Sequence, residues 1–423
     1  MLIEFSVSNF RSFRERQTFS MVAAPRLHKR NNVFKPQLSG EKFPDLLKVA
    51  VVYGPNASGK SNLLKALDVV RRIASRGPST ADIPLPVSPF RFDASLVDQP
   101  SVFEVHFIHA GVRYQFDLSA TAERIVKERL VSFPKGVETL LYNRQHEEIG
   151  DQYTYGERLE GGDDLIQTWR KLTPPSVLFI GQAVANSNEE LSQLRLPLLW
   201  LKSGVRSVLD GMRGYAHASQ GLAGSGESHA TSIASFLRDV DVPISKIKVE
   251  STSRTDEADE NNGKVNDDER KSSLANLQSK TKTTLTHRTA LGDAEIDYSD
   301  ESEGTKNLIG FWLPWIIKAS VKNPARVLVV DELDSSLHPM IVAALVKKHL
   351  DSDIDTQLIF TTHDTHLMDS KLLRRDQVWI TERDINGATQ LRSIHEFEGR
   401  EGEDIEKRYF EGRYRGLPFV KKD

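Results

Sequence analysis

The chain has 423 residues, of which 27% are charged and 39% hydrophobic, and its formal net charge at pH 7 is −3. The length allows two or three domains, the lack of cysteine excludes disulfides and cysteine-ligated metal centres, and the charge balance excludes a global basic field for nucleic acid. No apolar run approaches the roughly 18 to 20 residues that cross a bilayer, and the N-terminus lacks a signal-peptide layout, so we expect a cytoplasmic protein without a membrane partner.

The first predicted elements are two strands and a glycine-containing loop. MLIEFSVSNF alternates apolar and polar residues, which predicts a strand within residues 1–10. The apolar run VAVVY (49–53) predicts a buried strand, and GPNASGKS (54–61) follows it directly. That loop fits the pattern G-x-x-x-x-G-K-[ST], in which backbone N–H groups surround phosphate oxygens and the lysine reaches the outer phosphates.

The residues after this loop favour a nucleotide site over a plain flexible turn. SNLLKALDVVRRIA has helical apolar spacing, so the N-terminal N–H groups of a helix would point at the phosphates. We therefore expect a nucleotide to bind here. The expected contact residues are Gly54, Asn56, Ser58, Gly59, Lys60, Ser61 and Asn62.

Three further strands are predicted before residue 134. The segments 101–108, 112–120 and 124–133 are rich in strand-forming residues, and Gly111 marks a turn between the first two. They indicate an antiparallel sheet beside the nucleotide site. We assign residues 1–184 to the N-terminal part of the nucleotide-binding domain.

The middle of the chain has a different pattern. Residues from about 185 to 250 have helical spacing, as in NEELSQLRLPLLWLKS and ATSIASFLRDV. Residues 251–285 mix both charge signs with Ser, Thr and Asn and contain almost no large apolar group, which predicts an exposed or disordered loop. We assign residues 185–290 to an inserted helical lobe that carries this loop.

Alternating helices and strands return in residues 291–423. SEGTKNLIGFWLPWIIKAS predicts a helix that Pro314 should kink. The strand VLVV, the helix MIVAALVKKHL and the strand QLIFTT then follow in that order, which indicates parallel β-α-β units. The predicted fold class is therefore α/β, with a mixed sheet and helices, an antiparallel β subdomain and the inserted lobe.

Acidic residues end the strand VLVV. We expect Asp331 to hold Mg²⁺ together with the Ser61 hydroxyl, because the tip of a buried strand beside a phosphate loop is the usual place for that carboxylate. Glu332 would then face the γ-phosphate and polarise the attacking water. A strand that ends at its first surface charge is the alternative interpretation.

Two more segments are candidates for phosphate contacts. His363 follows the strand QLIFTT, where it can donate a hydrogen bond to the γ-phosphate. Ser302 and Gly304 open a predicted helix, and helix N-termini bind anions. A structural histidine and a helix-capping serine are the alternative interpretations.

The ordered series GPNASGKS, SEGTK, VLVVDELDSSLHP and TTHD resembles the ATP-binding-cassette class, in the branch of SMC, RecF and OLD-type ATPases. SVSNFRSF is similar to the N-terminal strand of that branch, which implies that Arg11 lies near the phosphates or the base. The segment EKRYFEGRYRGLPFV resembles the RloA-like ATPases of bacterial phage-defence islands, a group that includes the ATPase subunit of PARIS systems.

The resemblance implies an ATPase head that hydrolyses ATP with Mg²⁺ and forms homo-oligomers. In this class two ATP molecules lie between two heads, so Ser302 and Gly304 would act on the γ-phosphate held by the other head. The residues expected to act on their own head's nucleotide are Lys60, Ser61, Asp331, Glu332 and His363. Two positions depart from the class: SEGTK lacks a second glycine, and His338 stands where many members carry an aspartate.

Several functions agree with this resemblance. In the first, head pairing controls a partner effector encoded nearby, expected to be a nuclease, in anti-phage defence. In the second, the chain is a RecF- or SMC-like DNA-repair ATPase that acts on DNA directly through a basic groove. The third is the energising subunit of a transporter. The segment SEGTK, which departs from the signature motif of transporters, and the central insertion weigh against this function.

A nuclease within this chain is a further alternative. OLD-type proteins carry a metal-dependent nuclease domain after the ATPase core, whereas 60 residues follow His363 here. We therefore expect any nuclease to be a separate polypeptide.

Overall fold

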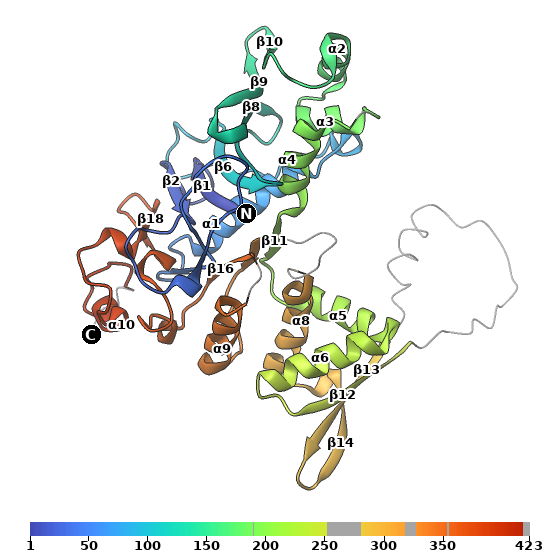
Figure 1. The fold of residues 1–423 in the computed structure, drawn as a ribbon, viewed down its shortest axis with the longest axis vertical. Helices are drawn as coiled ribbons and strands as arrows, with labels where there is room; N and C mark the ends of the chain where they lie inside the picture. Colours follow the sequence, from blue (N-terminus) through green and yellow to red (C-terminus); the bar gives the residue numbers. More distant parts are fainter. Residues whose placement is uncertain (189, 252–280, 318–326, 353–354, 418–423) are drawn as a thin grey trace, which may run out of the picture. The chain divides into compact units, whose positions relative to one another are not determined.

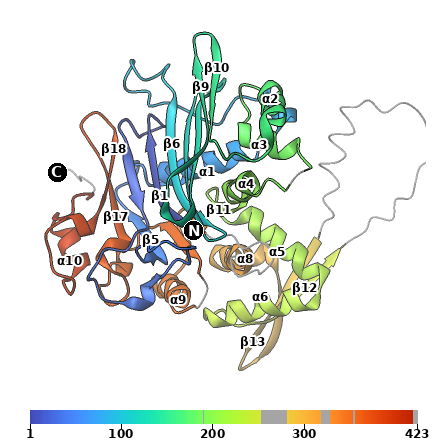
Figure 2. The same cartoon turned by 45° about the horizontal axis from the view of Figure 1, so that its top comes forward.

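The computed structural model describes residues 1–188, 190–251, 281–317, 327–352 and 355–417. The chain divides into two compact units (Figures 1 and 2). The first contains Met1–Asp210, Ile317–Asp334 and His338–Asp423, and the second contains Gly211–Ile316 and Ser335–Leu337. Most of the predicted loop 251–285 lies outside the described residues, and residues 281–285 belong to a strand.

A six-stranded sheet forms the centre of the first unit. Its order is β11 (Val205–Val208), β15 (Val327–Val330), β16 (Gln357–Thr361), β5 (Val49–Tyr53), β17 (Val378–Arg383) and β18 (Thr389–Ser393). All neighbouring pairs are parallel except β17 and β18, which are antiparallel. Every residue of β15, β16 and β5 is buried, because a parallel sheet is covered on both faces.

An antiparallel sheet of seven strands also belongs to the first unit. Its order is β10 (Gly150–Tyr155), β9 (Thr139–Glu147), β8 (Ile125–Phe133), β7 (Val112–Ala120), β6 (Ser101–His109), β1 (Leu2–Ser8) and β2 (Gln17–Ser20). The predicted strands within 1–10 and over 101–133 are thereby confirmed. A separate two-stranded ribbon joins β3 (Val33–Phe34) to β4 (Leu46–Leu47).

The first unit also contains α-helices. They are α1 (Lys60–Ala74), α2 (Gly162–Leu172), α3 (Phe179–Ala185), α4 (Ser192–Ser203), α9 (Pro339–Leu350) and α10 (Ile405–Phe410). The apolar residues that predicted α1, including Leu63, Leu64 and Leu67, are buried in the main core. Within the described ranges, no helix combines the length and apolarity that a membrane crossing requires.

The second unit contains both helices and strands. Its elements are α5 (Arg213–Ser225), α6 (Glu227–Asp239), β12 (Ile244–Ser251), β13 (Thr281–Thr289), β14 (Gly292–Asp297) and α8 (Glu303–Ile317). The strands form an antiparallel sheet in the order β12-β13-β14. Besides containing the strands β12 and β13, this unit differs in two further ways from the helical lobe expected over residues 185–290. Helix α4 packs in the first unit, where Leu194 and Trp200 join its core, and the segment after residue 290 contributes β14 and α8 to the second.

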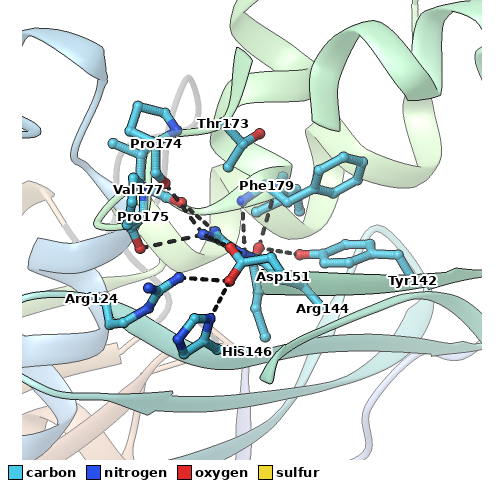
Figure 3. A network of polar contacts seen from close by, with 12 residues as sticks. Arg124, Tyr142, Arg144, His146, Asp151, Thr173, Pro174, Pro175, Val177 and Phe179 are labelled. Carbon is cyan, nitrogen blue, oxygen red and sulfur yellow. Dashed lines mark hydrogen bonds and ion pairs between the residues drawn. The ribbon is translucent and has the colours of Figure 1, made fainter. Parts of the chain in front are cut away.

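A buried polar network fastens α3 to the antiparallel sheet (Figure 3). The Glu128 carboxylate on β8 is fully buried and accepts hydrogen bonds from the Tyr142 hydroxyl at 2.5 Å and from the Phe179 amide at 2.8 Å. Burial raises the pKa of Glu128, and the nearby Arg144 acts in the opposite direction. The Arg144 guanidinium also binds the Asp151 carboxylate and the Val177 carbonyl, so one cation joins β8, β9 and β10 to the segment before α3.

Replacing this cation should destabilise the first unit. Arg144→Met would leave the buried Glu128 carboxylate without its positive partner, whereas Asp151 would keep its ion pair with Arg124, and we expect the free energy of unfolding to fall by about 3–5 kcal/mol. Urea unfolding followed by circular dichroism would measure the change. Arg413→Met, which removes the exposed pair with Glu411, is the control and should barely move the midpoint. Equal midpoints for the two variants would contradict the assignment.

Candidate nucleotide site

Three neighbouring parallel strands carry the predicted site residues of the first unit at one edge of the sheet. The glycine loop follows β5, Asp331 follows β15, and His363 lies two residues after β16. β16 pairs with both other strands, and strands lie about 4.8 Å apart, so the ends of β5 and β15 are about 10 Å apart. Segments some 270 positions apart in sequence therefore meet where ligands bind in α/β sheets.

The loop between β5 and α1 needs glycine at both of its fixed positions. Gly54 has φ 148° and Gly59 has φ 109°, which other residues rarely adopt. A Cβ atom on Gly54 would overlap the Thr381 carbonyl oxygen, and one on Gly59 would overlap the Thr389 hydroxyl. At the tip of the loop Asn56 is exposed. The backbone of the loop is thus in close contact with β17 and β18, whereas the tip of the loop is exposed to solvent.

Hydroxyl groups from distant segments hold this loop in shape. Ser58 Oγ lies 2.6 Å from Thr381 Oγ1, and Thr389 Oγ1 lies 2.8 Å from the Ser58 carbonyl oxygen. Ser12 Oγ lies 2.8 Å from Thr389 Oγ1 and accepts a hydrogen bond from the Asn62 amide, also at 2.8 Å. Sequence reasoning missed Ser12, Thr381 and Thr389, because hydroxyl residues in strands and turns carry no motif of their own.

Arg11 lies beside this hydroxyl cluster. It has a left-handed backbone with φ 51°, and its amide donates to the Ser88 carbonyl at 2.8 Å. Its side chain is exposed, with the guanidinium 5.6 Å from the centre of the Phe10 ring. The next residue, Ser12, contacts Asn62 of α1. Arg11 is therefore one residue away from a direct contact with the helix that follows the loop.

The Lys60 amine lies within the loop and in the field of the acidic segment. Lys60 is 7% exposed, and Nζ donates to the Gly54 carbonyl at 2.9 Å and to the Pro55 carbonyl at 3.2 Å. Burial lowers the pKa of Lys60, and the negative charges of Asp331 and Glu332 act in the opposite direction. The charges of Asp331 and Glu332, the acidic pair, therefore act on the Lys60 amine.

Thr361, the last residue of β16, fixes the acidic pair. Its hydroxyl donates to Asp331 Oδ1 at 2.6 Å and accepts the Glu332 amide at 2.8 Å. Glu332 has φ 52°, a left-handed conformation that a non-glycine residue keeps only where the surroundings hold it. The His363 amide donates to Asp334 Oδ2 at 3.2 Å. Both Glu332 and His363 are exposed, so their side chains are accessible to a ligand.

Ser302 and Gly304, the residues predicted to contact the nucleotide of a second head, belong to the second unit. Ser302 Oγ accepts the Thr305 amide at 3.1 Å, so this serine caps α8 as the alternative interpretation stated. A Cβ atom on Gly304 would lie 2.6 Å from the Ser336 carbonyl oxygen. Gly304 is therefore required by the close approach of a neighbouring backbone. His338 is the N-cap of α9, where Nδ1 accepts the Met340 amide.

The oxygen donors present suit Mg²⁺ bound together with nucleotide phosphates. Among the described residues, no three His, Asp or Glu side chains form a preformed metal cluster. Mg²⁺ characteristically takes one or two carboxylates and completes its shell with phosphates and water. Ser61 and Asp331 would supply one hydroxyl and one carboxylate. Asp334 Oδ1 is buried and makes no hydrogen bond within the described part of the chain, which leaves a further acceptor next to the acidic pair.

The parallel sheet and the geometry of the glycine loop are those of a P-loop ATPase head with mixed α/β architecture, as predicted. The family model described as "AAA domain, putative AbiEii toxin, Type IV TA system" matches residues 49–201 and 213–369. The chain belongs to this family.

Two solved structures of SMC heads are similar to the chain. One is the SMC head bound to the C-winged helix domain of ScpA, with 11% identity and a TM-score of 0.45 over 93% of this chain and 97% of that one. The other is the SMC head domain from Thermotoga maritima, with 13% identity and a TM-score of 0.41 over 93% of this chain and 98% of that one. No curated protein matches the chain.

The hydroxyl of Thr389 should contribute to ATP affinity by holding the loop. Thr389→Val keeps the shape but removes the donor to the Ser58 carbonyl, which costs about 1 kcal/mol and should raise the Kd for ATP about fivefold. Equilibrium binding of a fluorescent ATP analogue would measure it. Thr389→Ser retains the hydroxyl and is the matched control, expected to bind as the unaltered chain does. If the valine variant binds equally well, the loop does not depend on β18.

Proposed function

We propose that the chain is a Mg²⁺-dependent ATPase whose nucleotide-driven head pairing controls a separate effector, a nuclease, in bacterial anti-phage defence. The observation that carries the ATPase part is the position of Lys60, buried within the glycine loop and in the field of Asp331 and Glu332. A buried amine beside two carboxylates is the charge arrangement that a triphosphate with its metal requires.

Each residue of the site then has a chemical role. The loop N–H groups and Lys60 would hold the phosphates, and Ser61 and Asp331 would hold Mg²⁺, which would neutralise charge on the phosphate oxygens. The Glu332 carboxylate accepts a proton from the water that attacks the γ-phosphorus. His363 donates a hydrogen bond to the γ-phosphate. Arg11, next to Ser12, contacts the phosphates or the base.

Head pairing supplies the second half of the proposal. Ser302 and Gly304 would meet the nucleotide held by a second copy of the chain, as the resemblance to the SMC and RecF branch implies. Ser302 is exposed at the start of α8, so it is accessible to such a partner. ATP binding would favour the paired state and hydrolysis would release it.

Two substitutions separate binding from turnover. Glu332→Gln cannot accept the proton of the attacking water, so it should bind ATP, lose at least a hundredfold in kcat and accumulate as paired heads. Lys60→Ala should lose ATP binding itself. Phosphate release and light scattering after size-exclusion chromatography would measure both effects. Hydrolysis by Glu332→Gln at the unaltered rate would show that another group is the base.

The effector is proposed from the family. Its description names a putative toxin of a type IV toxin–antitoxin system, which supports a partner gene next to this one. The resemblance of the C-terminal segment to phage-defence ATPases supports the same setting. In that setting the chain senses infection and restrains or releases the effector.

Direct action on DNA is the second candidate, and one observation favours it. Two cavities of the first unit share Arg30 and are lined by many basic side chains and fewer acidic ones. The basic side chains that line them are Arg26, Lys29, Arg30, Lys35, Lys42, Lys347, Lys371 and Arg374. Arg374 is buried and paired with Asp376, and of the others all but Lys29 are exposed. Such a surface attracts a phosphate backbone.

One experiment distinguishes the two candidates. The purified chain should leave plasmid DNA intact, and cleavage should appear only when the product of the adjacent gene is added. Cleavage by the chain alone would contradict a separate effector. Duplex binding that weakens steeply between 50 and 200 mM salt, and that Lys347→Glu with Lys371→Glu abolishes, would support direct action on DNA.

A further inference from the structure

The segment Asp331–Leu337 joins the acidic pair to the second unit. Asp331–Asp334 belong to the first unit and Ser335–Leu337 to the second. Three peptide steps separate Glu332 from Ser335, and consecutive Cα atoms are 3.8 Å apart, so this connection spans at most about 11 Å. It is a short covalent connection between residues that belong to the two units.

The first unit holds the start of this segment at two points. The Thr361 hydroxyl accepts the Glu332 amide at 2.8 Å, and Asp334 Oδ2 accepts the His363 amide at 3.2 Å. Both contacts come from the end of β16. The backbone of the proposed base is therefore fixed to the strand that also carries the proposed γ-phosphate donor.

Helix α8 of the second unit holds the other end. The Asn307 side-chain amide donates to the Ser335 carbonyl at 3.0 Å. One turn earlier, Gly304 leaves room for the Ser336 carbonyl, which lies 2.6 Å from where a Cβ atom would be. Residues three apart lie on one face of a helix, so the same face of α8 contacts both backbone groups. Ser336 itself is left-handed, with φ 60°.

We propose that Asn307 is a positioning residue for Glu332, because it ties the helix that carries Ser302 and Gly304 to the segment that carries the base. A displacement of α8 would then move Ser335 and, through three peptide steps, Glu332. The two left-handed residues, Glu332 and Ser336, lie on either side of this connection and set its direction. This inference rests on the proposed function. It would allow contact between a second head and Ser302 or Gly304 to affect the position of Glu332 in the same chain.

The test separates turnover from ATP binding. Asn307→Leu and Asn307→Asp match the size of the amide but cannot donate to the Ser335 carbonyl. We expect kcat for ATP to fall at least tenfold in both, while KM and the Kd for ATP change less than twofold. Asn307→Gln retains a donor and should restore part of kcat. Steady-state phosphate release and analogue binding would measure these values.

Asn186→Ala is the matched control. It removes the same kind of bond, from an asparagine amide to the Gln182 carbonyl at 2.8 Å, at the end of α3. Its kcat should equal that of the unaltered chain. In a Glu332→Gln background, Asn307→Leu should cause no further loss, because both changes act on one group.

The outcomes distinguish this inference from the proposed function. If the unaltered chain does not hydrolyse ATP, the proposed function fails. If it does, and both Asn307 variants turn over at its rate, the positioning role of Asn307 fails alone. If the Asn307 variants lose as much in ATP binding as in kcat, the role of Asn307 is only structural. The same follows if Asn307→Leu causes its full loss of kcat in the Glu332→Gln background. Either result would also overturn the inference.

Discussion

The site depends on keeping one ammonium group out of water. Burying an amine is unfavourable unless carbonyl groups and opposite charges receive it, and Lys60 has both. The carbonyls come from the loop itself, whereas the charges come from the end of a strand two positions away in the sheet. The parallel order of β15, β16 and β5 is therefore the constraint that makes a charged lysine tolerable within the loop.

Local patterns were enough to predict the parts of this site that are contiguous in sequence. The loop Gly54–Ser61, the helix after it and the strand before Asp331 each carry a signal within about fifteen residues. Thr361, Thr381 and Thr389 carry none, because the hydroxyl of a strand residue acquires a role only when sheet order brings it to its partner. The strands β12 to β14 were missed for a related reason. In β13, alternation of threonine with other polar residues leaves Leu285 as a lone large apolar residue.

The boundaries of the two units do not coincide with changes in the sequence pattern. The helical pattern after residue 185 continues through α4 and α5 with little change in composition, yet Trp200 stacks on Phe107 with ring centres 4.1 Å apart, which fixes α4 to the antiparallel sheet. The boundary falls only at residue 210. Three residues, Ser335–Leu337, belong to the second unit although their neighbours on both sides belong to the first, and no composition change marks them.

The contacts of Thr381 and Thr389 with the loop have a consequence for synthesis. Domains of a growing chain fold from the N-terminus as they emerge, and the loop at residues 54–61 is made before every strand of its sheet except β5. The strands that shape it, β17 and β18, come more than 310 residues later. A nascent chain therefore carries its phosphate-binding sequence long before that sequence can take its binding conformation. The loop can therefore bind nucleotide in this conformation only after β17 and β18 have been made.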